Sequence, residues 1–151
     1  MSATSIRRRV MAALIDRLAA ISVNDGYETD AGASILFGEA PQLGPGDPDT
    51  ALAIVIGDDA PTAQASVAMM VPTPFEVYGV AKVTPEDPFN PVEAVLADIK
   101  RAVELPDRTL GGLLAEIQRG ETRGLPRDPG ATTAGVAITY LLTWKEGWGT
   151  P

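Results

Sequence analysis

The stretch TAGVAITYLLTWK, residues 133–145, decides the fold of this chain. Bulky apolar side chains occupy alternate positions, and a strand would place all of them on one face: Val136, Ile138, Tyr140, Leu142 and Trp144. The opposite face is smaller and more polar, with Ala137, Thr139, Leu141 and Thr143. This pattern predicts a central or near-central strand with helices packed on its large apolar face.

Composition limits both the size and the chemistry of the protein. The chain has 151 residues, 45% of them hydrophobic, which predicts a single globular domain over residues 1–151. It contains no cysteine and no histidine, so disulfides, thiolate nucleophiles, Cys or His zinc ligands and His-based proton transfer are excluded. We therefore expect no enzymatic activity and no cofactor. The net charge of −8 opposes sequence-independent binding of DNA.

The N-terminus carries three arginines followed by an apolar segment, an arrangement that a signal peptide also has. Asp16 and Arg17 interrupt the apolar segment, and no run approaches the roughly 20 apolar residues of a membrane helix. Apolar residues recur at every fourth position instead, which predicts an amphipathic helix from Ser5 to about Ile21. We expect a soluble protein made in a cytoplasm, with no membrane partner.

Periodicity and breaker residues divide the rest of the chain. Short apolar runs predict strands at 32–38, 51–57 and 75–83, in addition to 133–145. A second helix should begin with Asn90 as its cap and Pro91 at its first position, and Pro106 should end it. A short third helix is expected over 109–118. Long loops rich in Pro and Gly are expected at 39–50, 58–74 and 119–133, and Pro72 and Pro74 should keep the preceding arm out of a central strand.

These elements predict an α+β fold. Its sheet should be mostly antiparallel and four-stranded, with two main helices and one short helix packed on one face. The loops contain acidic residues that could gather around Ca²⁺ or Mg²⁺, but turn residues facing solvent explain them more simply: Asp47, Asp49, Asp58, Asp59, Glu86 and Asp87. Neither a GxxxxGK[ST] loop nor a strand-to-helix GxGxxG is present. We predict no catalytic, cofactor-binding or metal-binding residue.

Several segments together resemble one protein family. The helix spacing Ile6, Val10, Leu14, Arg17, Leu18 is followed by GYETDAGASILFGE at 26–39 and PDTALAIVIGDD at 48–59. FEVYGVAKV at 75–83, NPVEAVLADIKRAV at 90–103 and the closing strand complete the series. This order resembles the tail terminator proteins of long-tailed bacteriophages, also called tail-completion or minor tail proteins. Similar parts occur in phage-derived gene transfer particles.

The resemblance implies a structural virion protein. Such a protein forms a ring with itself, expected to be a hexamer, which caps the tail tube, stops addition of tube protein and offers a surface to the head-completion protein. DNA passes through the lumen without specific binding, and acidic walls would not retain it. The protein would assemble in the bacterial cytoplasm and remain at the head-proximal end of the tail. A head–tail connector or head-closure subunit and a metal-dependent hydrolase are the alternatives.

Loops and unexplained side chains are the candidates for contacts with neighbours in the virion. An aromatic residue in the Gly-rich tail either anchors such a contact or folds back on its own domain. The predicted interface residues are Arg7, Arg8, Leu43, Asp47, Asp49, Met69, Met70, Phe75, Arg119, Arg123, Arg127 and Trp148.

Overall fold

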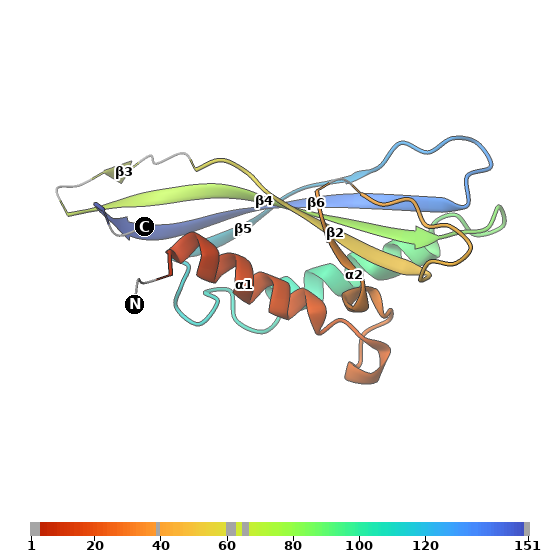
Figure 1. Ribbon diagram of the computed structural model, residues 1–151, viewed down its shortest axis with the longest axis horizontal. Coiled ribbons are helices and arrows are strands. Elements are labelled where there is room, and N and C mark those ends of the chain that lie inside the picture. Colours follow the sequence, from red (N-terminus) through yellow and green to blue (C-terminus); the bar gives the residue numbers. More distant parts are fainter. Residues whose placement is uncertain (1–3, 39, 60–62, 65–66, 150–151) are drawn as a thin grey trace.

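The computed structural model describes residues 4–38, 40–59, 63–64 and 67–149 of the chain. It is an α+β fold with a mixed sheet in the order β1-β2-β4-β6-β5, and a short strand, β3, also pairs with β4. The strands are β1 (Ile35–Phe37), β2 (Thr50–Ile56), β3 (Ala63–Gln64), β4 (Ala68–Lys82), β5 (Glu116–Gly124) and β6 (Thr133–Gly147). Helices α1 (Ile6–Ala19) and α2 (Asn90–Glu104) lie on the same face of the sheet (Figure 1).

The antiparallel pairing of β4 with β6 is the longest contact in the sheet. It runs without a register break from Ala68↔Gly147 to Lys82↔Thr133. β2 pairs with the second half of β4, and β5 pairs with the other edge of β6. The predicted alternation of β6 is confirmed, because Tyr140, Leu142 and Trp144 are fully buried on the face that carries the helices.

The two helices close the core over that face. Ser5 caps α1 by accepting a hydrogen bond from the Arg8 backbone N–H at 3.2 Å. In α2, apolar residues at helical spacing are buried against β4 and β6: Val92, Val95, Leu96, Ile99, Ala102 and Val103. Gly79 of β4 lets α2 approach closely, since a Cβ there would lie 2.6 Å from Val95 Cγ1. Two short 3₁₀ turns, η1 (Val23–Asp25) and η2 (Ala31–Ala33), connect α1 to β1.

The prediction that Pro72 and Pro74 lie outside a central strand was wrong. Both belong to β4 and pair with Thr143 and Leu141 of β6. The Pro74 carbonyl oxygen accepts a hydrogen bond from the Gly57 N–H at 2.7 Å, so this carbonyl points away from β6. The nitrogen and the carbonyl of one strand residue point to the same side, so the Pro74 nitrogen also points away from β6. The prolines therefore remove no bond from the β4–β6 ladder. Residues 60–62 and 65–66 of the predicted loop 58–74 lie outside the described part of the chain. Residue 39, from the predicted loop 39–50, lies outside it as well.

The prediction of a short helix over 109–118 was also wrong. Leu110, Gly111 and Gly112 have consecutive φ values of 49°, 68° and 90°, which no right-handed helix accommodates. The Asp107 carboxylate holds this turn by accepting hydrogen bonds from the Thr109 and Gly111 backbone N–H groups. Those bonds and a third from the Thr109 hydroxyl lower the pKa of Asp107 to about 2. The chain then enters β5, which occupies part of the predicted loop 119–133.

Two further expectations about the sheet and α2 need correction. The sheet is not four-stranded, because β5 adds a strand outside β6 and β3 pairs with β4. It is mostly antiparallel as predicted, but mixed, since β1 pairs with β2 in parallel. The start of α2 is held by Asp87 rather than by Asn90, since the Asp87 carboxylate accepts a hydrogen bond from the Asn90 N–H at 3.1 Å. Pro91 occupies the first turn as predicted.

A buried carboxylate ties the connection after α1 to α2. Asp98 is 0% exposed and faces the segment that follows η1. It accepts hydrogen bonds from the Glu28 N–H at 3.0 Å, the Thr29 N–H at 2.8 Å and the Thr29 hydroxyl at 2.7 Å. A buried charge is tolerated only when its oxygens are hydrogen-bonded in this way.

We expect Asp98→Ala to lower the free energy of unfolding by about 1–3 kcal/mol, because it leaves three partly buried donors without their acceptor. Urea denaturation followed by circular dichroism measures the change. Asp16→Ala is the matched control, since Asp16 is an exposed helical aspartate and should lose about 0.5 kcal/mol or less. Equal losses in the two variants would contradict this role of Asp98.

Candidate interaction surface

No helix covers the second face of the sheet within the described part of the chain, and we call this surface the open face. Its side chains alternate with those of the core along each strand. The central ones are Val55 of β2, Glu76 and Tyr78 of β4, Leu141 of β6 and Arg123 of β5. Val55 and Leu141 are each 37% exposed, so large apolar side chains reach solvent here beside charged ones.

A polar cluster occupies the middle of the open face. The Arg123 guanidinium donates to the Glu76 carboxylate at 2.5 Å, and it lies 5.9 Å from the centroid of the Tyr78 ring. Burial and the neighbouring Glu76 carboxylate raise the pKa of Tyr78, so its hydroxyl stays protonated at neutral pH. The cluster joins β4 to β5 across β6, and its contacts order these long side chains without a partner.

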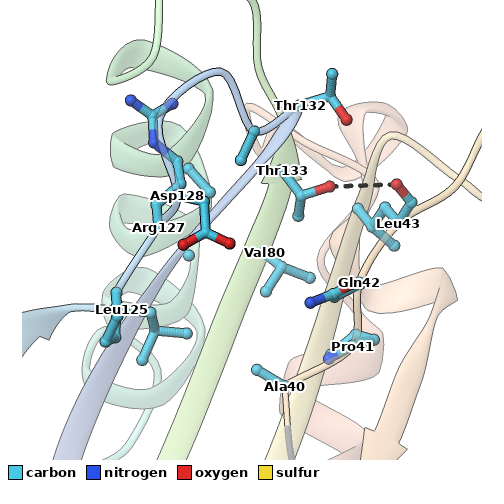
Figure 2. A pocket seen from close by; sticks show the side chains of 14 residues that line it. Ala40, Pro41, Gln42, Leu43, Val80, Leu125, Arg127, Asp128, Thr132 and Thr133 are labelled. Atoms are coloured by element: carbon cyan, nitrogen blue, oxygen red, sulfur yellow. Dashed lines mark hydrogen bonds between the residues drawn. The ribbon is translucent and has the colours of Figure 1, made fainter.

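A cavity of about 550 Å³ lies at one end of the open face. Figure 2 shows Val80 between the segment 40–43 on one side and the segment that contains Leu125, Arg127 and Asp128 on the other. The Thr133 hydroxyl donates to the Leu43 carbonyl oxygen at 3.2 Å, which links the two walls. Most of the lining residues are apolar, Gln42, Thr132 and Thr133 add uncharged polar groups, and Arg127 and Asp128 supply the charged ones.

The structure brings four predicted interface residues to the open face or its cavity. Arg123 lies in the centre, and Arg127 and Leu43 line the cavity. Met70 lies farther along β4 and is half-buried. Leu43 is only 8% exposed, because it packs on Ala51 and Val80 and so belongs mainly to a small core.

Other predicted residues lie elsewhere. Phe75 was a wrong choice, since it is 0% exposed and belongs to the main core. Met69 packs against that core as well. Asp47 and Asp49 are exposed beside Lys82, whose ammonium donates to the Asp47 carbonyl oxygen at 2.6 Å. Trp148 follows β6 and is 52% exposed.

Arg7 has a structural role that the sequence did not reveal. Gly57 and Pro74 are the next facing pair beyond the β2–β4 ladder, and Pro74 has no N–H to donate to the Gly57 carbonyl. The Arg7 guanidinium supplies this bond at 2.7 Å and also pairs with Asp59, which accepts from Thr73 at 3.0 Å. Arg8, one residue later, is exposed.

Arg119 is likewise engaged within the chain. It forms a bidentate ion pair with Glu104 at the end of α2. Arg119 Nε donates to Glu104 Oε2 at 3.0 Å, and Arg119 Nη2 donates to Oε1 at 2.6 Å. The buried Tyr140 hydroxyl donates to the same carboxylate at 2.7 Å. Burial and this negative neighbour raise the pKa of Tyr140 far above its ordinary value. The cluster joins α2 to β5 and β6, so it stabilises the edge of the sheet.

Sequence reasoning missed Val55, Glu76, Tyr78 and Leu141 as surface residues. The signal for Leu141 was present in the alternation of 133–145, where it is the one large apolar side chain on the smaller face. The clustering of Glu76 and Tyr78 with Arg123 had no such signal, because it depends on the register of β5 against β6.

Comparison with known proteins assigns no family: no protein-family model matches the chain, and no curated protein matches its sequence. Among the described residues, no helix is long and apolar enough to cross a membrane. The same residues contain no group of three or more His, Cys, Asp or Glu side chains placed to hold a metal ion. A function therefore has to be proposed from the residues and their arrangement.

Replacing Arg7 by Ala should lower the free energy of unfolding by about 1–3 kcal/mol, because the Gly57 carbonyl and Asp59 lose a charged donor. Thermal and urea denaturation measure this change. Arg8→Ala is the control, because Arg8 carries the same charge at the next position of the chain and is exposed. It should lower the free energy of unfolding by about 0.5 kcal/mol or less. If Arg8→Ala destabilised the protein as much as Arg7→Ala, loss of positive charge rather than loss of these bonds would be the cause.

The stabilisation contributed by Glu104 should disappear in acid. Burial acts to raise its pKa, but the hydrogen bonds from Arg119 and Tyr140 and the charges of Arg119 and Lys100 outweigh burial and lower the pKa below its ordinary 4.5. The folded chain therefore holds this proton less tightly than the unfolded chain does. The stabilisation is complete above pH 4.5 and is lost as the pH falls through the lower, folded value.

Urea denaturation of the wild type and Glu104→Gln between about pH 6 and pH 3 tests this expectation. The difference in free energy of unfolding should shrink toward the acid end. Glu116→Gln, at an exposed position of β5, should stay close to the wild type throughout. A Glu104→Gln difference that does not change with pH would contradict the assignment.

Proposed function

We propose that this protein is a structural assembly protein that caps the tube of a phage-type tail as a ring, in the manner of a tail terminator. The open face is the observation that supports a docking role most directly. It combines exposed Val55 and Leu141 with the preorganised Arg123–Glu76 pair, a mixture of apolar side chains and ordered polar groups that suits protein interfaces.

The shape of the subunit supports a repeated assembly. The sheet extends along the β4–β6 pair, while the helices cover only one face (Figure 1). Subunits that use one surface for the tube and other surfaces for one another can close a ring by rotation. The net charge of −8 suits a channel through which DNA moves without being held. The resemblance in the order of segments supplies the identity of the tube as the partner.

Two features of the open face suit contact with the tube end in particular. The Arg123–Glu76–Tyr78 cluster offers both signs of charge and a ring face within one patch. The cavity beside it, between segments 40–43 and 125–135, can receive a side chain or a loop of the partner. The head-completion protein would bind the far side of the ring.

We expect Leu141→Arg to abolish capping without unfolding the chain, because it replaces an exposed apolar side chain of the open face by an unpaired charge. Purified protein is mixed with polymerising tail tube protein of the same particle, and tube lengths are measured by negative-stain electron microscopy. The wild type should bind tube ends and shorten the tubes. Leu141→Arg should leave them as long as tubes grown alone.

Val23→Arg is the matched control, since Val23 is a 54% exposed apolar residue of η1, away from the open face. It should cap tubes like the wild type. The proposal would be rejected if the wild-type protein does not bind tube ends. Binding to the head or portal side with unchanged tube length would instead identify a head–tail connector.

A further inference from the structure

One aromatic side chain projects from the end of the molecule where β4 leads into α2. Phe89 is 72% exposed and precedes the first residue of α2. Glu86 and Glu93, both exposed, flank it in sequence. Neither carboxylate has an ion-pair partner among the described residues. An aromatic ring held in water between free carboxylates has no role in the core of its own subunit.

A complementary pocket lies at the start of α1. It has a volume of about 320 Å³, and apolar residues Ile6, Leu113 and Leu114 line it. The charged residues in the lining, Arg9 and Lys145, are both cations. Neither is part of an ion pair in the described part of the chain. The pocket therefore suits an apolar side chain that has carboxylates beside it.

Phe89 cannot reach this pocket within one subunit. Lys145 pairs with Met70 near the start of β4, whereas the turn before Phe89 follows Lys82 at the other end of that strand. Twelve residues of strand separate them, about 40 Å at the usual rise. Figure 1 shows the same separation, with the start of α1 on the left and the β4–α2 connection at the right end.

We propose that Phe89 of one copy docks into the pocket between Arg9 and Lys145 of a second copy, with Glu86 and Glu93 facing the two cations. The contact joins opposite ends of the subunit, so it is heterologous, and its repetition closes a ring or extends a filament according to the rotation between copies. It rests on the proposed ring cap in one respect, since it names the contact that would hold that ring together.

Variants that test the contact can be made without disturbing the fold. Phe89 occupies the capping position of α2, where aspartate is among the preferred residues, so Phe89→Asp should not weaken the helix. Arg9 lies in the first turn of α1, where a negative charge is favourable, so Arg9→Glu is equally safe. Circular dichroism should show both variants to be folded like the wild type.

Site-specific disulfide formation is the decisive experiment. The chain has no cysteine, so Phe89→Cys on one copy and Leu113→Cys on another are the only thiols in the mixture. Mild oxidation should yield at least about ten times more covalent heterodimer than the control pair Val67→Cys and Leu113→Cys. Val67 is 76% exposed and matches Phe89 in access to solvent. Equal yields from the two pairs would overturn the proposal.

Sedimentation of full-length variants gives an independent readout. Phe89→Asp and Arg9→Glu should each weaken self-association at least about tenfold. An equimolar mixture of the two should form dimers and nothing larger, because only one productive end-to-end contact remains. Self-association that both substitutions leave intact would reject the contact.

The two proposals fail separately. Tubes that are capped normally while the Phe89→Cys and Leu113→Cys pair gives no specific cross-link would reject this contact alone. If the protein gives the specific cross-link but does not bind tube ends, the tail function would be rejected and the contact between copies would stand.

Discussion

The pairing of β4 with β6 is the constraint on which the rest of the structure depends. Each strand has 15 residues, and they stay in register from end to end. Their shared apolar face buries Phe75, Tyr140 and Trp144 under the two helices, and each of these large side chains removes much apolar surface from water. β2 and β5 attach to the outer sides of this pair. Because β6 is the last strand in the chain, its long pairings with β4 and β5 cannot form until it has been synthesised.

Sequence reasoning located the elements whose signals are local. The alternation in 133–145 predicted both the strand and its buried face, and Pro91 marked the start of α2. Sequence reasoning failed where contacts between segments far apart in the chain determine the local structure. The place of Pro72 and Pro74 in β4 depends on the side of the strand that their nitrogens face, and that requires knowing the partner strands. The turn at Leu110–Gly112 had a local signal in its glycine pair, but the apolar residues around it suggested a helix.

The candidate surface was predictable only in part, for the same physical reason. Arg123 and Arg127 reached the open face or its cavity, while Arg7 and Arg119 turned out to serve the fold. A cation in a sequence gives no indication of whether a carbonyl or carboxylate will face it. Phe75 was misplaced because it opens the predicted strand 75–83 directly after the predicted loop 58–74, whereas its strand partners Ile56 and Tyr140 place it in the core.

The prolines of β4 have a consequence for behaviour at high protein concentration. Between Met70, where β3 ends its pairing, and Phe75, where β2 begins, the described part of β4 has no ladder partner on the side away from β6. A gap of this kind normally offers unpaired amide groups as a template on which a foreign strand can grow. Pro72 and Pro74 have no amide hydrogen to present there, and the carbonyl of Pro74 is already occupied by Gly57. The same residues that looked like interruptions thus reduce the tendency of this long strand to template amyloid-like aggregation.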